Sequence, residues 1–309
     1  MRPPATFCPA VLCPWNETIL HNFGPTGSAD GSAPESDLTR DVAGNLYGTT
    51  NLGGGDCGGR GCGTVFMIDP QGQETVLHSF TGSPDGAYPS TAAVLLDNSG
   101  NIYGTTSSGG TYGNGTVFEL SPSGSGWQEN ILYNFTGGAD GLGPLAGVIQ
   151  DAAGNLYGNT GEGGSYAGSC SFGCGVVFEL SPTGSGWTET VLYTFTGAPD
   201  GASPVAKLLK DRAGNLYGTT SSGGSSSACS FEYPGGCGTV FELSPNGSGW
   251  TETILWTFTG GADGAIPFGP VVMDREGTLY GAAGVGGDLN AANPECFGQG
   301  CGTAFKLTR

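Results

Sequence analysis

The chain has 309 residues, of which only 12% are charged, and its formal net charge is −18. This acidity disfavours binding to nucleic acid and to anionic membranes, because both select basic surfaces. No apolar run approaches the roughly 20 residues of a membrane helix, and the first segment, MRPPATFCPAVLCPW, lacks the apolar core of a signal peptide. We therefore expect no nucleic-acid partner, no membrane insertion and no signal peptide in this chain.

The 61 glycines follow no G-X-Y period, and 37% of the residues are hydrophobic. Glycine at regular intervals between aromatic residues is typical of an all-β fold with many tight turns. The ten cysteines mostly form close pairs, which favours an oxidising compartment.

The first predicted element is a strand over residues 15–23, WNETILHNF. It is followed by five copies of one unit, with G-N-L-Y-G or a close variant starting at residues 44, 100, 154, 214 and 277. Each copy continues to G-[TV]-[VA]-F, at residues 63, 115, 175, 238 and 302. A repeat of this length is typical of an array of similar structural units.

Each unit contains four short segments rich in β-branched and aromatic residues, which predict strands A to D. In examples from different repeats these segments are AAVLLD (92–97), NLYGTT, GTVFEL and TETVLYTF (188–195). The A–B turn has the pattern D-x-x-G-N, in which the aspartate can accept hydrogen bonds from the downstream backbone. Four antiparallel strands in each repeat of about 55 residues predict the blade of a β-propeller.

The last repeat stops after strand C, at GTAFKLTR, and residues 15–23 resemble a strand D. We therefore predict one domain over residues 1–309, a five-bladed β-propeller with four antiparallel strands per blade, whose ring is closed when residues 15–23 complete the last blade. The blades are expected at about 34–80, 89–135, 144–195, 204–258 and 267–309 plus 15–23. The rival is a strand-exchanged assembly, in which residues 15–23 pair with another molecule; otherwise we expect a monomer.

The repeat carries D-x-x-G-N-L-Y-G-T-T, then G-G, G-T-V-F, L-Y-x-F-T-G and D-G. It resembles the GloVer tandem repeats of bacterial extracellular "choice-of-anchor" proteins. The resemblance covers nearly the whole chain and implies a secreted or surface-anchored bacterial propeller. It carries no established activity and no catalytic residues. The chain departs from the pattern by ending at KLTR with no anchor.

In a four-stranded blade the B–C and D–A loops share one face. The B–C loops differ widely between repeats, so we predict that this face carries the function. Four of them hold a cysteine pair, and a fifth pair precedes residue 15. We predict the disulfides Cys8–Cys13, Cys57–Cys62, Cys170–Cys174, Cys229–Cys237 and Cys296–Cys301. A cysteine zinc site is disfavoured, because no pair has C-x2-C spacing and neither histidine is nearby.

Each D–A loop contains an aspartate followed by glycine. The carboxylates are Asp30, Asp85, Asp140, Asp200 and Asp263. They could be turn residues or a ring that binds sugar hydroxyls or Ca²⁺; we expect no other cofactor. Aromatic residues in the loops could stack on sugars or pack beneath glycine-rich backbone. They are Tyr88, Tyr112, Tyr166, Phe172, Phe231, Tyr233, Phe268 and Phe297. The two histidines, His21 and His78, occupy a strand-D position that Tyr133, Tyr193 and Trp256 hold elsewhere, which favours a structural role.

Four charged residues depart from the repeat and are the candidate catalytic groups. Glu35 and Asp37 begin strand A of the first repeat, Lys207 replaces a glycine in the fourth, and Glu162 replaces a serine in the third. Strand A lines the central channel of a propeller. Paired carboxylates there resemble those of glycosidases with this architecture. The alternative is an ion pair or a solvated charge.

Three functions fit these observations. The first is a secreted or cell-surface module that binds carbohydrate or another extracellular ligand through the loop face. The second is a polysaccharide-active enzyme, a hydrolase or lyase, that uses the channel carboxylates. The third is a structural surface or assembly protein. We favour the binding module slightly over the enzyme.

Overall fold

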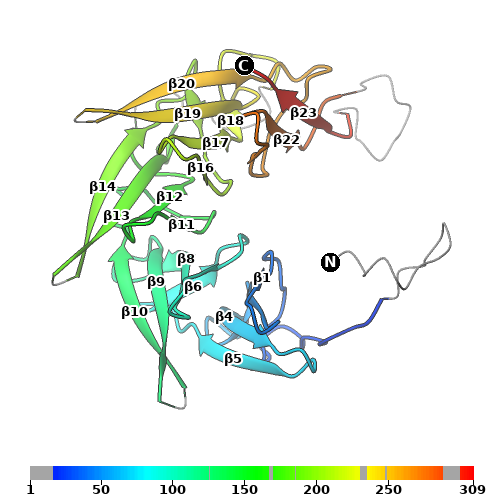
Figure 1. Cartoon of the computed structure of the whole chain (residues 1–309), viewed down its shortest axis with the longest axis vertical. Helices are drawn as coiled ribbons and strands as arrows, with labels where there is room; N and C mark the ends of the chain where they lie inside the picture. Colours follow the sequence, from blue (N-terminus) through cyan, green and yellow to red (C-terminus); the bar gives the residue numbers. More distant parts are fainter. Residues whose placement is uncertain are drawn as a thin grey trace.

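The computed structural model describes residues 17–124, 126–166, 170–184, 186–229, 235–247, 249–287 and 300–309. These residues form strands, turns and bends with no helix. No helix in the described part of the chain is therefore long and apolar enough to cross a bilayer. Figure 1 shows that the sheets follow one another along an arc, in the order of the sequence, as the blades of a propeller do.

The first two repeats each form one sheet in the predicted order of strands A to D, with one additional short strand. The first contains β1 (Thr39–Arg40), β2 (Leu46–Thr50), β3 (Gly53–Gly54), β4 (Gly61–Ile68) and β5 (Glu74–Ser79). The second contains β6 (Gly86–Pro89), β7 (Leu95–Leu96), β8 (Ile102–Gly109), β9 (Thr116–Ser123) and β10 (Gly126–Asn134).

The next two repeats form four-stranded antiparallel sheets. The third contains β11 (Ile149–Gln150), β12 (Leu156–Thr160), β13 (Val176–Thr183) and β14 (Gly186–Thr194). The fourth contains β16 (Leu209–Lys210), β17 (Leu216–Thr220), β19 (Thr239–Asn246) and β20 (Gly249–Thr257). Two short strands, β15 (Gly201–Ala202) and β18 (Ser222–Gly223), pair beside the fourth sheet.

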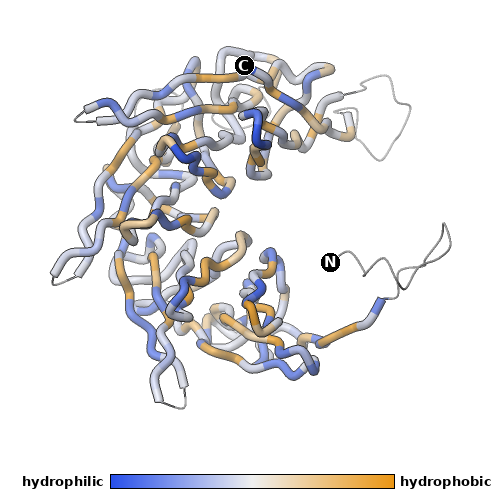
Figure 2. Tube along the Cα trace, in the orientation of Figure 1, coloured by the Kyte–Doolittle hydropathy of each residue, from blue (hydrophilic) through white to orange (hydrophobic). Residues whose placement is uncertain are grey.

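The last sheet has three strands among the described residues, β21 (Val272–Met273), β22 (Leu279–Ala283) and β23 (Thr303–Leu307). The predicted closing strand does not pair with it in this structure. Residues 17–24 belong to no strand, residues 15 and 16 lie outside the described part, and β23 pairs only with β22. Residues 17–24, which contain an apolar stretch (Figure 2), instead pass beside the first sheet, where Phe23 packs against Phe66 and a Cβ on Gly72 would lie 3.2 Å from the carbonyl oxygen of Leu20.

Strands C and D are longer than the sequence pattern predicts. Serine, proline and glycine favour turns, but in the second repeat Pro122 of the S-P-x-G segment lies opposite Trp127 within the β9–β10 pairing. Strand A is shorter and is reduced to two paired residues in each sheet. The predicted A–B turn is confirmed, because Asp97 Oδ1 accepts hydrogen bonds from the amides of Ser99 and Asn101, both at 2.8 Å.

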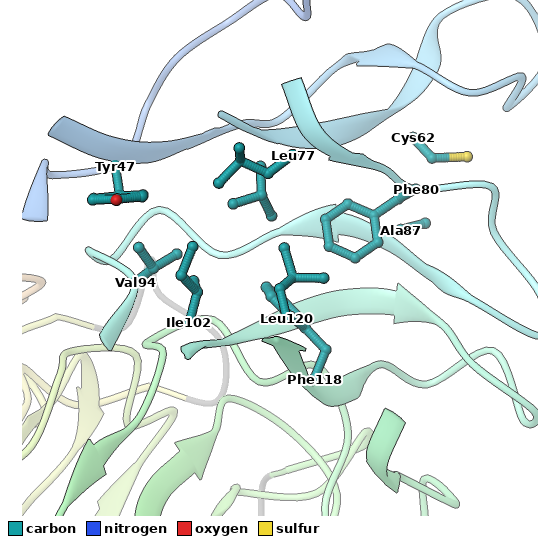
Figure 3. Close-up of a cluster of buried hydrophobic side chains, with 10 residues drawn as sticks. Tyr47, Cys62, Leu77, Phe80, Ala87, Val94, Ile102, Phe118 and Leu120 are labelled. Atoms are coloured by element: carbon teal, nitrogen blue, oxygen red, sulfur yellow. The ribbon is translucent and has the colours of Figure 1, made fainter. Parts of the chain in front are cut away.

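The hydrophobic core lies between consecutive sheets. Tyr47 and Leu77 from the first sheet pack with Val94, Ile102 and Phe118 from the second, as Figure 3 shows. The phenylalanine of strand C lies against the strand-B glycine of its own sheet, where a Cβ would have no space. A Cβ on Gly104 would lie 2.5 Å from Cζ of Phe118. The repeated L-Y-G and T-V-F motifs are therefore two halves of one packing unit.

Candidate binding face

The D–A loops pair with the start of the B–C loops, so these two sets of loops share one face. Antiparallel bridges join Ser32 to Leu52, Leu142 to Glu162 and Ala265 to Val285. The β15–β18 pairing does the same in the fourth repeat. The variable B–C loops are therefore held in place by backbone hydrogen bonds to the D–A loops, and the predicted common face exists.

Three of the predicted disulfides are confirmed: Cys57–Cys62, Cys170–Cys174 and Cys229–Cys237. Cys301 is disulfide-bonded as well, whereas Cys8, Cys13 and Cys296 lie outside the described residues.

Two of the three disulfides, Cys57–Cys62 and Cys229–Cys237, lie beside the D–A loop that follows their own repeat. A Cβ on Gly260 would lie 2.8 Å from Sγ of Cys229 and 3.0 Å from Sγ of Cys237. In the second repeat, which has no cysteine pair, the side chain of Asn114 occupies the corresponding place. A Cβ on Gly137 would lie 2.5 Å from its Nδ2. Both arrangements join the two loops of one repeat.

Each D–A aspartate binds the turn that it ends and one side chain at the predicted strand-D position. Asp140 accepts hydrogen bonds from the backbone amide of Thr136 at 2.7 Å and from Tyr133 Oη at 3.1 Å. The strand-D donors in the other loops include both histidines. The pairs are His21–Asp30, His78–Asp85, Tyr193–Asp200 and Trp256–Asp263. The two histidines therefore take the place of an aromatic donor, and the carboxylates have structural partners.

Sequence reasoning missed a second carboxylate beside these aspartates. Four of the aspartates, Asp30, Asp85, Asp140 and Asp200, each lie near a glutamate on strand D of the repeat that follows. One carboxylate oxygen of each glutamate is buried and has no hydrogen-bond partner. These glutamates are Glu74, Glu129, Glu189 and Glu252. Burial, together with the charge of Asp140, raises the pKa of Glu189 to about 7. The signal in the sequence was an acidic residue repeated within an apolar strand, as in T-E-T.

The loop aromatics differ in exposure. Tyr112, Tyr166, Phe172 and Phe268 are between 56% and 65% exposed, although Tyr166 Oη also donates a hydrogen bond to the carbonyl oxygen of Gly137. Tyr88 is half-buried against the core between the first two sheets. The remaining three predicted aromatics, Phe231, Tyr233 and Phe297, lie outside the described residues.

Lys207 reaches across two repeats. Its Nζ donates a hydrogen bond to the carbonyl oxygen of Ala93, in the second repeat, at 3.2 Å. Burial lowers the pKa of Lys207, and the negative charge of Asp37 opposes that shift. Three repeats therefore meet at this ammonium group. Glu35 accepts a hydrogen bond from Asn51 Nδ2 at 3.2 Å.

Glu162 lines a cavity of about 260 Å³ on the loop face. Three serines and three apolar side chains also line it: Ser107, Ser108, Ser203, Leu142, Leu145 and Val205. Burial raises the pKa of Glu162 above its ordinary value. No hydrogen bond or ion pair among the described residues joins Glu162 to Glu35, Asp37 or Lys207.

The residue before the D–A proline has a left-handed backbone in every repeat. Its φ is 55° at Ala33, 56° at Tyr88, 65° at Gly143, 54° at Ser203 and 57° at Ile266. L-residues rarely adopt this conformation, which is often found at functional sites. Gly143 and Ser203 also line the Glu162 cavity. Two of these five positions therefore contribute to the surface of that cavity.

The fold and the loop face define a repeat protein built of consecutive β-sheets, with variable loops on one side. The family model described as the Gloeobacter/Verrucomicrobia repeat matches residues 15–231 and 91–309, and the chain belongs to that family. None of the curated proteins compared with the chain matches it.

Two solved structures are among those similar to this chain. One is an X-ray structure provisionally described as a gluconolactonase, with 14% identity, coverage of 79% of this chain and 69% of the other, and a TM-score of 0.44. The other is a gluconolactonase from Xanthomonas campestris, with 15% identity, coverage of 79% and 67%, and a TM-score of 0.46.

Proposed function

We propose that this chain is a secreted or cell-surface binding module of bacterial origin, and that it closes into a five-bladed β-propeller that binds carbohydrate on its loop face. The Glu162 cavity carries the proposal. A carboxylate and three serines around the cavity offer hydrogen-bond partners for sugar hydroxyls, and the side chains of Leu145 and Val205 offer apolar contact. Exposed Tyr112 and Tyr166 add aromatic surface on the same loops.

Closure of the ring is supported by side chains that are exposed only at the two ends of the arc. Leu38 of the first repeat is 51% exposed, whereas its counterpart Val94 is 3% exposed between two sheets. Tyr280 of the last repeat is 36% exposed, whereas its counterpart Tyr217 is 1% exposed. Elsewhere these two positions pack together across the interface, as Tyr47 and Val94 do. Contact between the two ends would bury both side chains.

The three confirmed disulfides support an extracellular location, because disulfides persist in oxidising compartments. Their sulfur atoms lie beneath the loop face, so they hold its shape before a ligand arrives. Such preorganisation reduces the entropy lost on binding.

A glycan array on the purified chain tests the proposed function, with Glu162→Ser as the matched variant. Serine is the residue at this position in the second and fourth repeats, Ser108 and Ser222, so the variant should fold. We expect binding to a restricted set of glycans by the original chain and at least tenfold weaker binding by Glu162→Ser. Absence of binding across diverse glycans, with and without Ca²⁺, would contradict a carbohydrate ligand.

A polysaccharide-active enzyme is the second candidate. It is favoured by the raised pKa of Glu162, because a protonated carboxyl group can act as a general acid. Turnover of a polysaccharide that is lost in Glu162→Gln, and kept in Glu35→Gln and Asp37→Asn, would assign the reaction to the cavity. A third candidate, a surface or assembly protein, uses for strand exchange the edge of β23 that pairs with no described strand. It predicts that light scattering reports a mass that rises with concentration.

A further inference from the structure

Three potential metal ligands meet where the first sheet contacts the second. His78 lies on β5, Asp85 lies in the loop that follows, and Glu129 lies on β10. His78 Nε2 is 3.3 Å from Asp85 Oδ2 and 3.5 Å from Glu129 Oε1. One ligand atom from each residue lies within 4.8 Å of the others, and within the described ranges no other group of three does so.

These separations fit a tetrahedral metal ion. Zinc binds imidazole nitrogen and carboxylate oxygen at about 2.0–2.2 Å, so neighbouring ligands around a tetrahedral zinc ion lie roughly 3.3 to 3.6 Å apart. The two measured edges of the group match this value. Three protein ligands would leave a fourth position for water or a bound ligand.

The ligand atoms are also prepared for a cation. Glu129 Oε1 is buried and accepts no hydrogen bond. Asp85 is oriented by the backbone amides of Thr81, at 2.8 Å, and Gly86, at 2.5 Å. Two carboxylates placed together away from water repel each other, and a divalent cation bound with neutral His78 would balance both charges.

The other interfaces show what this one would be without a metal ligand in the strand-D position. Tyr133 and Tyr193 occupy the place of His78 and donate their hydroxyl groups to Asp140 and Asp200. A tyrosine satisfies the aspartate but leaves no nitrogen ligand. His78 therefore adds a nitrogen donor beside carboxylates that the scaffold already supplies.

We propose that His78, Asp85 and Glu129 bind a first-row divalent cation, with zinc as the best fit, at the interface of the first two repeats. This site is separate from the Glu162 cavity and does not depend on the proposed carbohydrate binding. A bound ion would join the first sheet and the loop after it to β10 of the second, and it would therefore stabilise this interface.

Isothermal titration of the chelator-treated full chain with Zn²⁺ tests the proposal, and absorption of Co²⁺ in the visible range reports tetrahedral coordination. The matched variant is His78→Tyr, which recreates the interface of Tyr133 and Tyr193 and should fold. We expect one Zn²⁺ per chain and a higher Tm with the metal. Both should be lost in His78→Tyr, with affinity falling by at least the roughly 10–100-fold that follows loss of an outer-shell partner.

His21→Tyr is the control, because His21 contacts Asp30 as His78 contacts Asp85, and Ser28 also donates a hydrogen bond to Asp30. This variant should keep the zinc affinity. Glu129→Gln keeps the size of the side chain and should lose the affinity, as His78→Tyr does. Two outcomes would overturn the proposal: no saturable Zn²⁺ binding by the original chain, or equal binding by a folded His78→Tyr.

Discussion

The rings of Phe23 and Phe66 meet edge to face, with centroids 4.8 Å apart and an interplanar angle of 62°. Phe80 and Phe118 meet in the same way, at 5.2 Å and 65°. In that second pair, Phe80 directly follows strand D of one repeat and Phe118 lies on strand C of the next. Phe23 is therefore already packed on the first repeat as the end of a preceding strand D would be, although no such strand forms.

Replacement of Leu20 tests ring closure. Leu20 is 46% exposed, but its counterpart Leu132 is 7% exposed. If residues 15–23 pair with β23, Leu20→Ala should lower the free energy of unfolding by about 2–5 kcal/mol. Urea denaturation measures the change, with the exposed Val42→Ala as the control. A loss below about 0.5 kcal/mol, the size of an ordinary surface effect, would show that Leu20 stays exposed.

The buried strand-D glutamates predict a pH dependence of stability. Burial raises the pKa of both Glu189 and Glu252 from 4.5 to about 7. Between these values the folded chain holds more protons than the unfolded chain, so stability falls as pH rises from about 4.5 to 7. Glu189→Gln and Glu252→Gln should each raise Tm at pH 8 and leave it nearly unchanged below pH 4.5. Thermal unfolding across this range measures the effect, and parallel curves for variant and original chain would contradict it.

Gly260 should tolerate no side chain. Its φ is 78°, and a Cβ would lie 2.8 Å from Cys229 Sγ. Gly277 has a similar φ of 83° but no atom within 4 Å of the added Cβ. Gly277→Ala should therefore cost only the backbone strain, about 1–2 kcal/mol. Gly260→Ala should cost about 1–3 kcal/mol more because of overpacking against the disulfide. Equal losses of unfolding free energy in Gly260→Ala and Gly277→Ala, measured in urea, would contradict close packing of the disulfide against Gly260.

Two substitutions of Lys207 test whether its charge or its apolar stem stabilises the contact between repeats. Methionine retains most of the apolar stem while removing a buried charge, so Lys207→Met should change the free energy of unfolding by less than about 1.5 kcal/mol or increase it. Lys207→Ala leaves a void and should cost about 2–5 kcal/mol. Chemical denaturation of both variants separates the contribution of the packed stem from that of the charge and its hydrogen bond. A large loss in Lys207→Met, matched by Lys207→Ala, would show that the bond to Ala93 and the charge of Asp37 dominate.

Much of the fold was predictable because the same local pattern occurs in all five repeats. The D-x-x-G-N turn and the spacing of cysteines such as Cys57 and Cys62 are short-range features, and the structure confirms both. The contacts of Lys207 with Ala93 and of His78 with Glu129 were not predictable. They join residues of different repeats, and they depend on how adjacent sheets are rotated and spaced, which no single repeat encodes.

Ring closure was predicted from a missing fourth strand, but the structure leaves residues 17–24 unpaired. The prediction used an alignment of sequence segments, whereas pairing also requires the two ends of the arc to meet. That closure is the least local contact in the molecule, so its entropic cost is the largest. The exposed Leu38 and Tyr280 indicate which surfaces would compensate for that cost.

The five left-handed residues before the D–A prolines have a consequence for how such proteins diversify. The same backbone conformation holds Ala33, Tyr88, Gly143, Ser203 and Ile266, so the surrounding turn dictates the shape whatever side chain is present. A single substitution at one of these positions can then change the chemistry at that point of the loop face while the turn keeps its course. The five repeats thus present five such positions, and each already carries a different residue.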